Sequence, residues 1–191
     1  MAVKGLVLDE GSEQIEFLAT AADTDGKLVE CRMTVAPGRP APPEHSHPKL
    51  EERFAVEHGR MGYVLGDRRL EAKPGETVIV PPGTNHTFWN AGYDPLVVSS
   101  EVRPAMRFED FVETIHVLIR DGRLQPGGQR PNPLLIAVVA REYRKEWRLT
   151  KLSPVARALL PLLAFAGRRL GYRGHYSIDA DEHPAQRPAT V

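Results

Sequence analysis

The chain has 191 residues, which is enough for one domain with its own hydrophobic core and a helical appendage. Apolar residues make up 41% and charged residues 26% of it, a balance that excludes a globally disordered chain. The formal net charge is zero, no nucleic-acid partner is predicted, and the single cysteine, Cys31, excludes an intrachain disulfide.

The segment from about 13 to 103 has the pattern of many short strands. Apolar side chains alternate at Ile15, Phe17 and Ala19, and again from 29 to 35. Shorter runs follow at 53–58, 61–65, 77–80, 87–90 and 96–102, separated by turn-forming Gly, Pro and Asp residues. Strands at this spacing predict a sandwich or barrel.

Beyond Pro104 the pattern becomes helical. Apolar residues recur at intervals of three and four, which predicts a helix over 107–120. Asn132, followed by a proline, predicts the start of a second helix that runs to about 149. A third helix is expected from Ser153, with Pro161 kinking or breaking it and a glycine at 167 or 171 ending it.

These patterns divide the chain into three parts. We predict a β-barrel domain over 10–103, a helical C-terminal extension over 104–176 and a disordered tail over 177–191. The predicted class is therefore mainly β with a C-terminal α-helical extension.

Four side chains form a candidate metal site: His45, His47, Glu52 and His86. Three imidazoles and one carboxylate suit one divalent transition metal, namely Fe, Mn, Ni, Cu or Zn. On a strand, residues two apart share a face, so His45 and His47 point the same way. Glu51 competes with Glu52 for this role, but adjacent strand residues point to opposite faces, so only one of the two enters a barrel.

Two motifs carry a family resemblance. The first comprises a glycine, HxH, a glutamate and a second glycine, at Gly38, His45, His47, Glu52 and Gly59, with one extra residue after Gly38. The second, GxxxxxPxGxxHxxxN, is matched at Gly75, Pro81, Gly83, His86 and Asn90. Over about 10–103 the chain therefore resembles the cupin superfamily, in particular its small single-domain bacterial members.

The resemblance implies a double-stranded β-helix, the cupin jelly-roll barrel, with metal ligands at His45, His47, Glu52 and His86. The family spacing to Gly59 favours Glu52 over Glu51. We also assign Glu52 a possible catalytic role as general base, should its bond to the metal be weak.

Three further residues are predicted around the ligands. Strand parity places Phe54 and Phe88 on the ligand face, where they line a substrate pocket or belong to the barrel core. Asn90 is assigned to the pocket or to fixing a turn. The histidines at 58, 116, 175 and 183 are interpreted as structural or solvated, with His116 outside the barrel.

Three functions are consistent with such a site. The first is an oxygenase of the quercetin dioxygenase-like type acting on an enolisable small molecule. The second is a non-redox metal-dependent cyclase, isomerase or decarboxylase. The third is a non-enzymatic module that binds a metal and a small molecule, because a fold alone does not decide among these.

Charge is distributed unevenly along the chain. Residues 123–173 contain eleven Lys or Arg and two Asp or Glu, so the rest carries the acidic excess. The apolar runs of this basic segment are expected to pack on the barrel or in a homodimer, with peripheral membrane contact as the alternative. No apolar stretch resembles a signal peptide or spans a bilayer, so we expect a cytoplasmic location.

Overall fold

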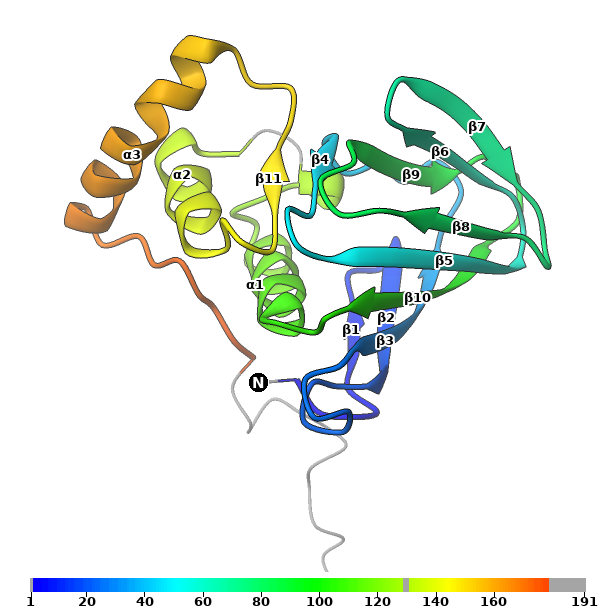
Figure 1. Ribbon diagram of the computed structural model, residues 1–191. Coiled ribbons are helices and arrows are strands. Elements are labelled where there is room, and N and C mark those ends of the chain that lie inside the picture. The colour runs from blue at the N-terminus through cyan, green and yellow to red at the C-terminus, as the bar shows by residue number, and fades with distance from the viewer. Residues whose placement is uncertain (1, 129–130, 179–191) are drawn as a thin grey trace, which may run out of the picture.

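The computed structural model describes residues 2–128 and 131–178. Two antiparallel sheets form the barrel (Figure 1). The first has the order β1 (Val7–Asp9), β2 (Glu13–Ala19), β3 (Val29–Val35), β10 (Leu96–Arg103), β5 (Glu51–His58), β8 (Thr77–Val80). The second has the order β11 (Arg148–Leu149), β4 (His45–Ser46), β9 (His86–Asn90), β6 (Met61–Leu65), β7 (Arg68–Ala72).

Alternation along the strands explains this arrangement. In β3, every second residue from Val29 to Val35 is buried, and in β5 the buried positions are Glu52, Phe54 and Val56. The buried sets of both sheets meet in one core. The predicted class, a double-stranded β-helix with a C-terminal helical extension, is confirmed.

The helices gather on one side of the barrel (Figure 1). They are α1 (Phe108–Arg120), α2 (Pro133–Glu142) and α3 (Pro154–Arg169), with a 3-10 turn, η1 (Pro126–Gly128), before α2. Phe108, Phe111, Leu135, Tyr143 and Trp147 belong to the same hydrophobic cluster as the barrel interior. The helical segment therefore shares a core with the barrel. The division at 103/104 into separate domains stays a prediction, and the predicted tail lies outside the described residues from 179 onward.

The second helix is shorter than predicted. It ends at Glu142, not near 149, and the chain turns to form β11, whose Leu149 pairs with His45 of β4. Tyr143 and Trp147 are buried on the way, so tertiary packing and strand pairing override the local helical pattern. The short strands β1, β4 and β7 were also not among the predicted strands, because segments of two to five residues show little periodicity.

Pro161 does not break the third helix, which was one of the two effects expected of it, and the expected kink stays a prediction. Pro161 lies inside α3, which continues to Arg169. A proline has no N–H for the carbonyl four residues earlier, at Arg157. Both residues are exposed, so water can serve that carbonyl. Gly171, with φ +87°, follows the C-terminal cap at Leu170 and ends the helix as predicted.

The predicted helix starts at Asn132 and Ser153 are confirmed. The Asn132 side chain accepts hydrogen bonds from the backbone N–H groups of Leu134 and Leu135, and Ser153 accepts one from Ala156. Between the helices, α3 presents Ala164 and Gly167 to Val138 of α2. Such small residues allow the two helices to pack closely.

Replacing Gly167 by Ala tests this packing. An added Cβ would lie 2.7 Å from Cγ2 of Val138 and 2.9 Å from the Leu134 carbonyl oxygen. Alanine improves helix propensity by about 1 kcal/mol, but overpacking costs about 1–3 kcal/mol. We expect a net loss of stability by thermal unfolding, whereas Ala158→Leu at an exposed position of α3 should be near neutral. A stabilised Gly167→Ala variant would contradict the close approach.

Candidate metal centre

The four predicted ligands meet between the two sheets. His45 and His86 lie opposite each other in the pairing of β4 with β9, and His47 follows β4 directly. Glu52 comes from β5 of the other sheet. One nitrogen from each of the three histidines lies within 4.8 Å of the other two, a grouping able to hold a metal ion.

Each imidazole is oriented by a backbone carbonyl. Nδ1 of His45 donates to the Pro43 oxygen at 2.8 Å, and Nδ1 of His86 to the Thr84 oxygen at 2.9 Å. Nδ1 of His47 donates to the Glu146 oxygen at 2.6 Å. Since a carbonyl only accepts, Nδ1 carries the proton in each ring and Nε2 remains for the interior of the site. Such outer hydrogen bonds are what orient histidine ligands in metal sites.

Glu52 completes the set. Its Oε2 lies 3.3 Å from Nε2 of His47 and 3.2 Å from Nε2 of His86, while Ser100 donates to its other oxygen at 3.3 Å. Glu51 points away from the site and accepts a hydrogen bond from Arg53 at 2.7 Å. Of the two adjacent glutamates, only Glu52 enters the barrel, as the strand alternation requires.

The protonation of His45 and Glu52 suits metal binding, whereas His47 would have to give up a proton to a metal. Burial, together with the nearby His86 and His47, holds the pKa of His45 well below its usual range, so this ring is neutral near pH 7. Burial alone would raise the pKa of Glu52, but hydrogen bonds and charge from His47 and His86 lower it, so the carboxylate is charged. Burial is likewise outweighed at His47, whose contact with Glu52 raises its pKa. A bound cation would replace the proton these groups share.

The ligands form part of the wall of a cavity of about 190 Å³. Phe54 and Phe88, with ring centroids 5.0 Å apart, line it from the barrel. Phe108, Phe111 and Trp147 line it from the helical extension. The barrel therefore supplies the candidate ligands and the extension supplies much of the apolar surface facing them.

Asn90 has a different place from the one predicted for the pocket. It is not among the residues that line the cavity. Its amide nitrogen donates to the carbonyls of Val35 and Asp94, and its oxygen accepts from the Gly92 N–H at 2.8 Å. The side chain fixes the turn after β9, which was the second role considered for it.

The cavity also contains polar residues that sequence reasoning missed. His116, placed outside the barrel by its helix, lines the cavity because α1 packs on the barrel and shares its hydrophobic core. Glu10, Glu13 and Arg39 line it too, with Arg39 bound to both carboxylates at 2.6 Å. Burial raises the pKa of Glu13 to about 7 although Arg39 opposes it. No local motif marks these residues, since the fold brings them together from distant segments.

Comparison with known proteins agrees with the geometry. The sequence profile of the Cupin_2 family, described as a cupin domain, matches residues 31–100. An uncharacterized protein of Methanocaldococcus jannaschii, MJ1618, is 33% identical over 66 residues. This match covers 35% of the chain and 53% of MJ1618, so the chain spans about half the length of that relative.

Similar solved structures match about half of this chain. A double-stranded beta-helix domain protein from Klebsiella pneumoniae has a TM-score of 0.45 and 22% identity, covering 51% of this chain and 82% of its own. KdgF from Halomonas sp. has a TM-score of 0.45 and 18% identity, covering 52% and 86%. A predicted oxalate decarboxylase from Thermotoga maritima has a TM-score of 0.46 and 17% identity, covering 48% and 80%.

The two glutamates offer a matched test of the site. We expect His47→Ala and His86→Ala each to abolish most metal binding, and Glu52→Ala to weaken it by at least about tenfold, because each removes a candidate donor. Glu51→Ala should bind as the unaltered protein does, since its side chain faces Arg53. Metal content by elemental analysis and titration checks this. Loss of metal in Glu51→Ala with retention in Glu52→Ala would reverse the assignment.

Proposed function

We propose that the protein is a metal-dependent cupin enzyme acting on a compact, mostly apolar small molecule, and the match of residues 31–100 to the cupin domain profile supports this. The observation that carries the proposal is a group of three imidazoles in the wall of an apolar cavity, with the Glu52 carboxylate against two of them. The reaction we infer is an oxygenation of the quercetin dioxygenase-like type, on an enolisable substrate.

The donor set fits one divalent transition metal, with His45, His47, Glu52 and His86 as its holders. Such a metal supplies Lewis acidity and, as Fe, Cu or Ni, redox chemistry with dioxygen. Glu52 stays ionised because its contacts with His47 and His86 lower its pKa, which suits a charged ligand to the metal. The same contacts weaken it as a base, so the proposed role as general base requires the bound metal to replace the histidine protons that Glu52 contacts here. The three backbone carbonyls hold the rings in place during the reaction.

The walls restrict the substrate. Phe54, Phe88, Phe108, Phe111 and Trp147 offer ring faces and edges and exclude water from the ligands. A cavity of about 190 Å³ is smaller than the roughly 300–1,000 Å³ of pockets for drug-sized ligands. We therefore favour a one-ring or open-chain 1,3-dicarbonyl over a three-ring flavonol.

Glu13 favours a second candidate function. A carboxyl group with a pKa of about 7 holds a proton on a large fraction of molecules at neutral pH, as a general acid requires. Glu13 lines the same cavity as the candidate ligands. A non-redox isomerase, cyclase or decarboxylase would use this proton together with a redox-inert metal such as Zn.

Oxygen uptake separates these functions. The protein is loaded in turn with Fe, Mn, Ni, Cu and Zn and supplied with a panel of 1,3-dicarbonyls and flavonols. We expect dioxygen consumption with a redox-active metal and a compact substrate, reduced at least about 100-fold in His86→Ala, which lacks a ligand. An oxygen electrode and product analysis by mass spectrometry provide the measurement, with Glu51→Ala as the control that retains the site.

Other results of this experiment would favour a different function. Conversion of substrate without dioxygen, supported by Zn and lost in Glu13→Gln, would favour the non-redox enzyme. Tight binding of the compounds without turnover under any metal would contradict an enzymatic role and favour a binding module. Full activity without metal in His86→Ala would contradict both metal-dependent functions.

A further inference from the structure

The outer face of α3 is apolar and uncovered. Its side chains Val155, Leu162 and Phe165 are 69%, 66% and 61% exposed, and Leu159 lies between them. Positions 155, 159, 162 and 165 fall on one side of a helix. The opposite side carries Ala164 and Gly167, which pack on α2. We call Val155, Leu159, Leu162 and Phe165 the α3 stripe.

A basic groove borders this stripe. Its cationic and anionic side chains are Arg107, Arg141, Arg144, Lys145, Arg168, Glu142 and Glu146, and Pro161 and Phe165 of α3 line it as well. We call these residues the basic groove. Phe165 therefore belongs to both features, which places the apolar stripe and the cationic groove side by side. Arg169 lies over the Phe165 ring at 5.0 Å, adding a further cation beside the stripe.

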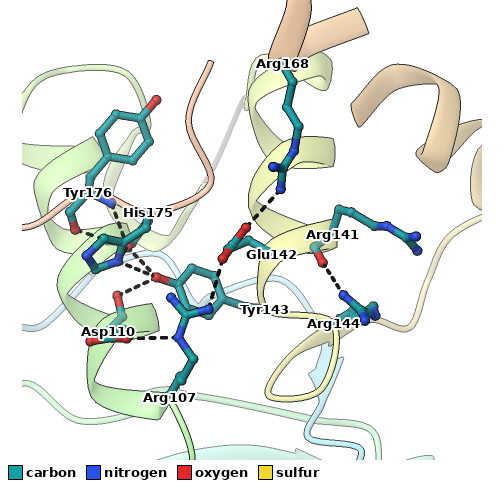
Figure 2. A network of polar contacts seen from close by, with 10 residues as sticks. Arg107, Asp110, Arg141, Glu142, Tyr143, Arg144, Arg168, His175 and Tyr176 are labelled. Carbon is teal, nitrogen blue, oxygen red and sulfur yellow. Dashed lines mark hydrogen bonds and ion pairs between the residues drawn. The ribbon is translucent and has the colours of Figure 1, made fainter. Parts of the chain in front are cut away.

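Internal pairing leaves much of this positive charge available. Figure 2 shows Glu142 between Arg107 and Arg168, with ion pairs of 3.0 and 2.9 Å. Among the described residues no ion pair includes Arg141, Arg144 or Lys145, although Arg144 donates to the Arg141 backbone oxygen. Nor does the acidic barrel neutralise the basic segment: within the part of the chain that the structure describes, Lys151 with Glu44 is the one ion pair from a cation of 123–173 to a barrel carboxylate.

We propose that this surface binds peripherally to a membrane containing anionic phospholipid. Headgroup phosphates occupy the basic groove, and the α3 stripe enters the boundary between headgroups and acyl chains. The charge pattern selects this occupant, because cations flank the apolar residues and α3 itself contains no acidic residue. None of the helices in the described part of the chain has the length and apolarity to traverse a bilayer, so the contact lies on the surface.

A second copy of the chain fits the same face poorly. A two-fold contact uses the same patch on both copies, so it would gather two basic grooves at one interface. Like charges placed opposite each other disfavour association. The apolar stripe alone would suit a dimer, but its cationic border does not.

Vesicle co-sedimentation of the full chain tests the proposal. We expect binding to phosphatidylcholine mixed with phosphatidylglycerol, no binding to phosphatidylcholine alone, and loss of binding at high salt. Leu162→Glu/Phe165→Glu and Arg141→Glu/Arg144→Glu should each weaken binding at least about tenfold, the first through the stripe and the second through the groove.

Two control variants are matched to these changes. Ile79→Glu/Tyr93→Glu introduces the same acids at exposed apolar positions of the barrel. Arg68→Glu/Lys73→Glu makes the same change in net charge in and just after β7, on the far side of the molecule from α3 in Figure 1. Both should bind vesicles as the unaltered protein does, and all four variants should keep their thermal stability and metal content.

Several results would overturn the proposal. One is the absence of vesicle binding, and another is equal weakening by the control variants. A third is a dimer, seen by analytical ultracentrifugation, that Leu162→Glu/Phe165→Glu dissociates while vesicle binding is absent, since the stripe would then be a protein interface. Because metal content is measured in parallel, failure here is distinguishable from failure of the proposed enzymatic function.

Discussion

The hydrogen bond from Nδ1 of His47 to the carbonyl oxygen of Glu146 joins the two halves of this molecule. It is 2.6 Å long, buried, and spans 99 residues of sequence. It fixes the tautomer and orientation of one candidate ligand, and it brings the chain to Trp147 and then to β11, which extends the sheet beside His45. A barrel without the helical segment would leave the Nδ1 donor of His47 without this partner and expose the rings around it.

The barrel and the helical extension contribute different parts of the site. The barrel places the nitrogens and the carboxylate through strand alternation and the pairing of His45 with His86. The extension adds Phe108, Phe111 and Trp147 to the cavity wall. The candidate ligands therefore come from the barrel, whereas the cavity wall combines barrel and extension residues. Under the proposed function, changes in the extension would alter the accepted substrate while the ligand set stays intact.

The sequence was informative where a rule is local. Alternation in β3 and β5 and the caps at Asn132 and Ser153 follow from neighbours a few positions apart. Alternation also says that only one of Glu51 and Glu52 enters the barrel, and the family spacing to Gly59 favoured Glu52. Prediction failed where a distant segment decides. The helix predicted to 149 ends at Glu142 because β11 pairs with β4, and His116 reaches the cavity because α1 packs on the barrel. The carbonyls that orient the histidines are backbone atoms, which no side-chain motif records.

The distribution of charge along the sequence also did not reveal how the two segments are joined. The basic segment and the acidic remainder of the chain carry opposite charge, yet the extension meets the barrel mainly through buried apolar residues. Apolar contact needs no complementary charges, and burying ion pairs would add a desolvation penalty. The basic side chains are consequently left on the outer surface, around Glu142 and along α3, where they face solvent and any anionic partner. Because the helical extension and the barrel are joined by apolar contacts, most basic side chains of the extension remain on the surface without acidic partners from the barrel, in the part of the chain that the structure describes.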